Sequence, residues 1–172
     1  LRCDCGAQLN AAMQAIAALQ QAVRLDPEYA IGYSNIALTY SNLARHAAES
    51  GSDPSEYVIK AEENAAQAEK IDKGNLLAAG SRAFAYLMQA VFEHDSGSDI
   101  EKTIDTFNRA IESILQRSPD LSIPYQHKAM GACILGMHRA RKQHDPEPAF
   151  TQALAAVAAC QQRTQGIDAN CA

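Results

Sequence analysis

Five histidines are the side chains in this sequence best suited to metal binding or acid–base chemistry: His46, His94, His127, His138 and His144. No two of them are four residues apart, the spacing that places two metal ligands on one face of a helix. His46 and His138 share one position of a sequence repeat, but they lie two repeats apart, on the order of 20 Å at helix packing distances. We therefore expect no metal site built from these histidines.

Five cysteines are the other candidate ligands and nucleophiles: Cys3, Cys5, Cys133, Cys160 and Cys171. Their odd number and scattered positions do not suit a disulfide framework and favour a reducing compartment. Cys3 and Cys5 have no further ligands nearby at the spacing of a zinc site. Cys133 lies six positions from His127, on the opposite side of a helix, so the two do not form a nucleophile and base. We expect no catalytic residue, metal or cofactor, and hence no enzyme.

Charge and hydropathy exclude two classes of partner. The 172 residues carry a formal net charge of -5, which leaves no basic surface for nucleic acid. The local basic cluster of Arg139, Arg141 and Lys142 is expected to be a solvated helix end, where positive charge is favoured. No apolar run reaches the ~18 residues of a membrane span, and the first residues lack the pattern of a signal peptide. We expect a cytoplasmic protein that binds proteins or peptides and no membrane.

The elements that position these residues follow a repeat of 46 residues. This interval separates Asp53 from Asp99 and Asp99 from Asp145, all three in turn-forming segments. The chain is expected to be a single domain, 1–172. Within it, the interval defines a half repeat, three full repeats and a tail, at 1–26, 27–72, 73–118, 119–164 and 165–172.

Each repeat is expected to hold two antiparallel α-helices. Apolar residues at i, i+3, i+4 and i+7 mark one face of a helix over about 28–50, namely Tyr33, Ile36, Ala37 and Tyr40. Steps of three and four mark a second helix over about 54–72, through Val58, Ala61, Ala65, Ala68 and Ile71. Three and a half such units predict an all-α fold with about seven helices. The alanines of both helices predict close approach of the axes, to about 8 Å.

The turn between the two helices has its own local chemistry. Gly51 can adopt the left-handed conformation that ends a helix. Asp53 can accept amide hydrogen bonds at the start of the next helix, whose first position suits Pro54. Glu56 is expected to reach back to the cap and complete a capping box. We assign structural roles to Asp53 and to its counterparts Asp99 and Asp145.

The run Leu25-Asp26-Pro27, followed by Tyr33, Ile36-Ala37 and Tyr40, resembles the junction between tetratricopeptide repeats (TPRs). The usual TPR unit has about 34 residues, so the present unit is longer. The resemblance implies a TPR-like α-solenoid, a right-handed superhelical stack of antiparallel helix pairs. The turn Gly51-Ser52-Asp53-Pro54 also resembles long-unit arrays attached to some bacterial serine/threonine protein kinases.

The resemblance implies that the first helices line a concave groove that binds a peptide or helix of a partner protein. The side chains expected to contact it are Asn35, Leu38, Ser81, Phe84, Met88, His127, Met130 and Ile134. Their apolar character, with methionines, suits an amphipathic helix or an extended peptide. Alternatively, these side chains are covered by the curvature of the array, by a second copy in a homodimer, or by further helices. A further alternative is a regulatory or oligomerisation segment of a larger signalling protein, such as a bacterial serine/threonine kinase.

Overall fold

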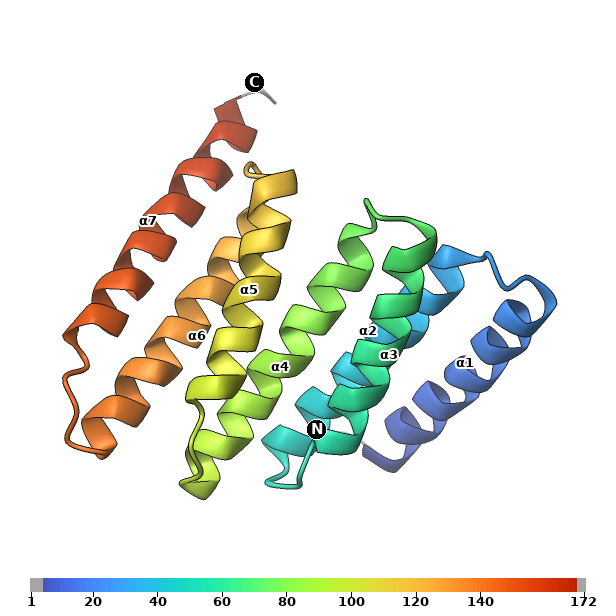
Figure 1. Cartoon of the computed structure of the whole chain (residues 1–172), viewed down its shortest axis with the longest axis horizontal. Coiled ribbons are helices and arrows are strands. Elements are labelled where there is room, and N and C mark those ends of the chain that lie inside the picture. The colour runs from blue at the N-terminus through green and yellow to red at the C-terminus, as the bar shows by residue number, and fades with distance from the viewer. Residues whose placement is uncertain (1–4, 170–172) are drawn as a thin grey trace.

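The computed structural model describes residues 5–169, with side chains for residues 6–164, and its regular elements are all α-helices. They follow one another from one end of the molecule to the other (Figure 1) as α1 (Cys5–Leu25), α2 (Ala30–Glu49), α3 (Ser55–Ile71), α4 (Leu76–Ser96), α5 (Glu101–Arg117), α6 (Ser122–Arg141) and α7 (Glu147–Ala169). The all-α fold expected from the repeat is confirmed. None of the helices in this range is long and apolar enough to cross a membrane.

The helix boundaries reproduce the interval found in the sequence. Helices α2, α4 and α6 begin at residues 30, 76 and 122, and helices α3, α5 and α7 begin at residues 55, 101 and 147, so both sets repeat every 46 residues. The helices expected over 28–50 and 54–72 are α2 and α3, with ends that differ by one or two residues. One repeat is therefore one pair of helices.

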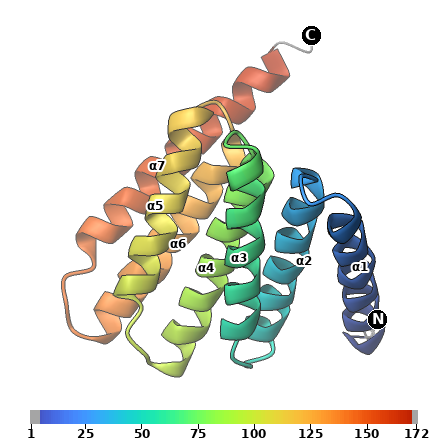
Figure 2. The same ribbon diagram turned by 45° about the vertical axis from the view of Figure 1, so that its right-hand side comes forward.

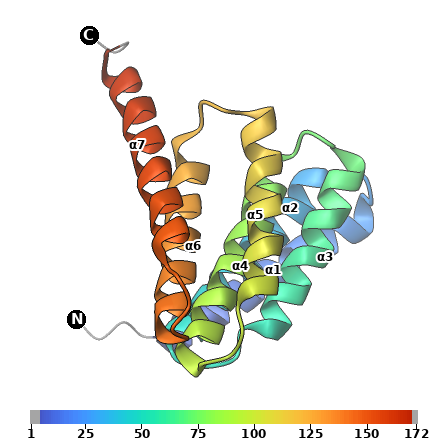
Figure 3. The same ribbon diagram turned by 60° about the vertical axis from the view of Figure 1, so that its left-hand side comes forward.

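The helices pack in two layers. Helices α2, α4 and α6 are neighbours in one layer, and α3 packs against both α2 and α4. Helix α5 packs in the same way against α4 and α6, on the side of that layer where α3 lies (Figure 2). At one end α7 runs beside α6 (Figure 3), and at the other end α1 contacts α2 and no other described helix. Helices α4 and α6 are thus each held by the helix pair that precedes them, and α2 is held by α1.

The first helix of every repeat ends in the same hydrogen-bonded turn. Gly51, Gly97 and Gln143 have φ angles of 73°, 80° and 60°. In each turn the next amide bonds back to the carbonyl five residues earlier, as in Ser52 N–H to Ala47 O at 2.8 Å, the pattern of a Schellman motif. The motif satisfies carbonyls that the helix end leaves unpaired. Only the third turn places a residue with a Cβ in the left-handed region.

The three aspartates accept amide hydrogen bonds at the starts of the second helices, as expected, although the N-cap residues of α3 and α5 are Pro54 and Ile100. Pro54 therefore lies one residue before the first helical position that was expected for it. The aspartate Oδ1 atoms accept the backbone N–H two residues ahead, at 2.9 Å for Asp53 and 3.0 Å for Asp99 and Asp145. Asp53 also accepts the Ser55 hydroxyl at 2.6 Å, and this bond, followed by the amide bond, lowers the pKa of its carboxyl. Glu56 does not complete the expected capping box, because its carboxylate accepts a hydrogen bond from Lys60 Nζ at 2.5 Å one turn ahead.

Alanine side chains fill the first junction between repeats, where α2 and α3 pack against α4. Ala65 and Ala68 of α3 are fully buried with Ala37 of α2 and Ala78 of α4, and the four form one cluster. Since none of these side chains extends beyond Cβ, three helix backbones approach one another closely. The expected role of small residues at this junction is confirmed.

Charged side chains join successive repeats at their edges. Arg82, on α4, pairs with Glu62 and Glu69 of α3, and Lys128 pairs with Glu112 across the next junction. The basic cluster on α6 is more than a solvated helix end. Arg141 donates to His94 O at 2.9 Å, and Lys142 donates to Gly97 O at 3.3 Å. These cations therefore bind the carbonyl end of the neighbouring helix α4 as well as favouring the end of their own helix.

The three left-handed turns predict opposite effects for exchanging glycine and glutamine. Gln143→Gly should stabilise the protein by about 0.5–1 kcal/mol, because relief of the left-handed strain exceeds the added entropy of the unfolded chain. Gly51→Gln should destabilise it by a similar amount for the opposite reason. Denaturant unfolding of both variants measures these changes. A decrease in stability for Gln143→Gly would show that this turn has no such strain.

Candidate binding groove

An apolar groove of about 430 Å³ lies between the first helices of the second and third repeats. It is lined by Leu38, Ser41 and Asn42 of α2, by Leu76, Leu77, Gly80, Ser81 and Phe84 of α4, by Ile111 and Ile114 of α5, and by Leu121, Ile123, Pro124 and His127 at the start of α6. No aspartate, glutamate, lysine or arginine is among them. The groove therefore offers a surface for apolar groups rather than for charged ones.

The second junction between repeats is built from larger side chains than the first, and we attribute the groove to this difference. One repeat after Ala65 and Ala68 of α3, helix α5 carries Ile111 and Ile114, and Pro124 takes the place of Ala78. Accordingly, α4 contacts α6 less extensively than it contacts α2. The two isoleucines, 1% and 3% exposed, form the buried wall of the space that results.

Phe107 of α5 meets α6 at a glycine. It occupies the repeat position of Ala61 and is fully buried. A Cβ placed on Gly131 of α6 would lie only 2.3 Å from Phe107 Cε1, so the ring uses the space that the missing side chain leaves. The size of the residue at 107 and the absence of a side chain at 131 together set how α5 meets α6.

The rim of the groove is apolar and open to solvent. Leu77 and Leu121 are each 42% exposed and Ile123 is 60% exposed. Phe84 stacks on the imidazole of His127, with ring centroids 5.3 Å apart and planes 27° from parallel, which links α4 to α6. Burial lowers the pKa of His127, so its ring is neutral at neutral pH. A neutral ring adds to the apolar surface.

The hydroxyl groups in the groove are already hydrogen-bonded within their helices. Ser41 Oγ donates to Leu38 O, and Ser81 Oγ donates to Leu77 O, each at 2.8 Å. The amide nitrogen of Asn42 donates to Leu38 O at 3.0 Å. These donors are consequently engaged within their own helix, and the groove presents mainly apolar surface.

Four of the eight side chains expected to contact a partner line the groove: Leu38, Ser81, Phe84 and His127. Ser81 lies at its floor and is only 3% exposed. Asn35 donates to Ile31 O and lies outside the groove, as does Met130, which is 45% exposed. Met88 and Ile134 were wrongly assigned to the binding surface. They are 5% and 8% exposed, because both side chains pack in the hydrophobic core.

Sequence reasoning missed the contribution of the second helices. Ile111 and Ile114 of α5 reach the groove from the other layer, and Leu121 reaches it from the turn before α6. The signal that could have identified them is the change from alanine at 65 and 68 to isoleucine one repeat later. These positions lie between successive first helices. A larger side chain there indicates that the distance between those two first helices is greater.

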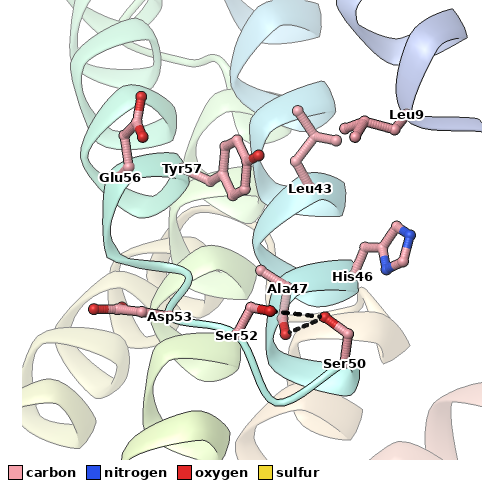
Figure 4. Close-up of a pocket in the computed structure, with 9 residues that line it drawn as sticks. All are labelled: Leu9, Leu43, His46, Ala47, Ser50, Ser52, Asp53, Glu56 and Tyr57. Atoms are coloured by element: carbon pink, nitrogen blue, oxygen red, sulfur yellow. Dashed lines mark hydrogen bonds between the residues drawn. The ribbon is translucent and has the colours of Figure 1, made fainter. Parts of the chain in front are cut away.

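A second cleft, of about 310 Å³, lies where α1 meets α2 and the turn before α3 (Figure 4). Asp53 and Glu56 at this cleft are engaged in the helix cap and in the pair with Lys60, and Ser50 Oγ donates to Ala47 O at 2.9 Å. His46 lines the cleft from α2. Because its charged groups serve local structure, we do not assign the function to this cleft.

No group of three or more histidine, cysteine, aspartate or glutamate side chains within the described residues could hold a metal ion. Cys133 is an exposed free thiol and Cys160 is a half-buried one. Cys3 and Cys171 lie outside the described residues, and the side chain of Cys5 is also outside them.

No protein-family model, curated protein or solved structure matches the chain. The TPR assignment therefore remains a prediction, carried by the sequence pattern and by the pairing of the helices.

The contact between Phe107 and Gly131 predicts a specific coupling between two substitutions. Phe107→Ala should destabilise the protein by about 3–5 kcal/mol because it leaves a cavity. Gly131→Ala should be destabilising by about 1–3 kcal/mol in the natural protein, where its methyl group meets the ring. In the Phe107→Ala variant the same change should become neutral or stabilising, because alanine favours the helix.

A double-mutant cycle by denaturant unfolding measures this coupling. Gly80→Ala is the matched control, because a Cβ at Gly80 meets no atom within 4 Å. Its effect should be the same whether residue 107 is phenylalanine or alanine. Equal effects of Gly131→Ala in the two backgrounds would contradict the proposed contact.

Proposed function

We propose that this chain is a non-catalytic protein-interaction scaffold that binds an apolar segment of a partner protein in the groove between α4 and α6. The observation that carries the proposal is an uncharged groove of about 430 Å³ with the exposed rim of Leu77, Leu121 and Ile123. Contiguous apolar surface of this kind marks sites of interaction, because water leaves it favourably when a partner covers it.

The lining favours a particular chemistry of partner. The groove has room for several aliphatic or aromatic side chains, and it has no ion to pair with a charged one. An amphipathic helix with apolar residues at i, i+3 or i+4, or an extended peptide with such residues in alternation, satisfies this requirement. Charged side chains of the partner would lie outside the rim.

Membership of the TPR family supports the same function and is part of the proposal. Pairs of helices that begin every 46 residues along the sequence, with α4 and α6 each packed on the preceding pair, are consistent with a TPR-like array. In such an array the first helices line the binding surface, and α2, α4 and α6 supply most of the groove. We place the protein in the cytoplasm, where free thiols such as Cys133 and Cys160 remain reduced.

Placing charge on the rim should weaken binding. Leu77→Glu combined with Ile123→Glu changes two exposed side chains, so the fold should be retained. Peptides selected from a random library against the natural protein serve as the probe, and their sequences should be rich in apolar residues. Their affinity for the double variant should fall about tenfold or more, as expected for the loss of central apolar contacts.

Ile31→Glu is the matched control for this experiment. Ile31 has the same repeat position as Leu77 and Ile123, is 58% exposed and lies outside the groove. Peptide affinity should be unchanged in this variant, as measured by fluorescence anisotropy. Selected peptides that bind equally well to the double variant would place the binding surface elsewhere.

Self-association is a second candidate function, and the surface of α7 favours it. Leu154 is 72% exposed, Val157 is 42% exposed and Phe150 is 37% exposed. No charged residue occurs between Glu147 and Arg163, so two copies of this helix would meet without repulsion between like charges. Such a surface suits the oligomerisation segment of a larger signalling protein, for example a bacterial serine/threonine kinase.

Sedimentation at increasing protein concentration tests this second candidate. Self-association through α7 predicts that the average mass rises toward that of a dimer. Leu154→Glu should keep the protein monomeric over the same range, because it would bring a charge into the contact. A natural protein that stays monomeric throughout would leave scaffold binding as the function.

A further inference from the structure

Two histidines meet at the ends of α4 and α6, far along these helices from the groove at their beginnings. The rings of His94 and His138 lie with centroids 5.9 Å apart and planes 65° from parallel. His138 is only 4% exposed. The Nδ1 atom of each ring is buried and has no hydrogen-bond partner among the described residues. The pair therefore forms part of the contact between the second and third repeats.

This arrangement tolerates neutral rings and disfavours protonated ones. A neutral imidazole has one nitrogen without a proton, which can be buried unpaired at modest cost. A protonated imidazole carries N–H groups on both nitrogens, and a buried donor without an acceptor is costly, especially when it is charged. If both rings were protonated, their charges would also repel each other at this separation.

The charged groups around the pair come from each neighbouring element. Lys142 lies on the α6 side, Asp99 belongs to the turn after α4, and Glu101 begins α5. Helix α7, which also packs against α6, has no charged residue between Glu147 and Arg163. Burial first, then Lys142 and His94, lowers the pKa of His138, and the two carboxylates oppose this shift without reversing it.

The contacts beside the pair hold the same two helix ends together. Arg141 and Lys142 donate to the carbonyls of His94 and Gly97, and Arg139 lies 3.5 Å from a carboxylate oxygen of Glu101. Because α4 contacts α6 less extensively than α2 contacts α4, these polar contacts belong to the weaker of the two junctions between first helices. A positive charge on an imidazole here would therefore act on the junction at which the first helices make the least contact.

We propose that the contact of His138 with His94 is an acid-sensitive latch, closed while the His138 ring is neutral, and that protonation of His138 separates the ends of α4 and α6. This latch is independent of whether the groove binds a partner. The folded protein holds the pKa of His138 below its ordinary value of 6.5, so the unfolded or opened form takes up the proton first as the pH falls. The stabilising contact is thus complete above about pH 6.5 and is lost progressively below it.

The repeat itself supplies substitutions that should remove the latch without disturbing the fold. The counterpart of His138 in the second repeat is Phe92, so His138→Phe introduces a ring that the chain already carries at this position. The counterparts of His94 are Ala48 and Ala140, which makes His94→Ala the second variant. His46→Phe is the matched control, because His46 has the same repeat position as His138 but lines the cleft beside α1.

Hydrogen exchange of backbone amides at pH 7.5 and pH 5.0 tests the latch, after division by the intrinsic exchange rates. In the natural protein and in His46→Phe, protection in the last turns of α4 and α6 should fall about tenfold or more at the lower pH. In His138→Phe and in His94→Ala the fall should be much smaller. An NMR titration of the imidazole of His138 should give a midpoint below 6.5.

Three results would overturn the latch. One is an equal loss of protection in the natural protein and in both latch variants, which would assign the effect to other groups such as His127. Another is a midpoint for His138 at or above 6.5. The third is an increase in protection at these helix ends on addition of Zn²⁺ that requires both histidines, which would make the pair a metal site.

Discussion

The spacing of the first helices depends on the size of the side chains that the second helices place between them. At the first junction, Ala65 and Ala68 meet Ala37 and Ala78, and the three helices approach closely. At the second junction, the equivalent positions of α5 hold isoleucines. Side chains in a packed interior cannot be compressed, so the extra volume has to be accommodated by moving a helix. Helix α6 is the one that packs less extensively on its predecessors.

The groove and the histidine pair both lie at this second junction. Near the beginnings of α4 and α6 the space remains open and exposes apolar side chains. Near their ends the helices are joined by Arg141, Lys142 and the rings of His94 and His138. A junction with few apolar contacts and with polar links at one end is the part of an array that can change its spacing most readily. Binding and acid sensitivity would act on the same pair of helices.

The repeat interval, the helix pairs and the aspartate caps could be predicted from the sequence because each depends on local residue types and spacing. The binding surface could be predicted only in part. The side chains off the packing face of the first helices were expected to be open to a partner, but Met88 and Ile134, which share one repeat position, are both buried. The contact of His94 with His138 was also missed, because the two differ in repeat position and meet only where α4 packs against α6. Neither the depth of a side chain nor the angle between helices is encoded by periodicity alone.

Helix α6 should be held further from α4 than α4 is from α2 if the isoleucines of α5 are the origin of the groove. Electron–electron distance measurements between spin labels at Ile31, Leu77 and Ile123 test this most directly, since these exposed residues share one repeat position. The labels would be attached to introduced cysteines, two at a time, after replacement of the five natural ones. We predict a longer distance between positions 77 and 123 than between 31 and 77. Equal distances would show that the array is uniform and would contradict an origin of the groove in side-chain volume.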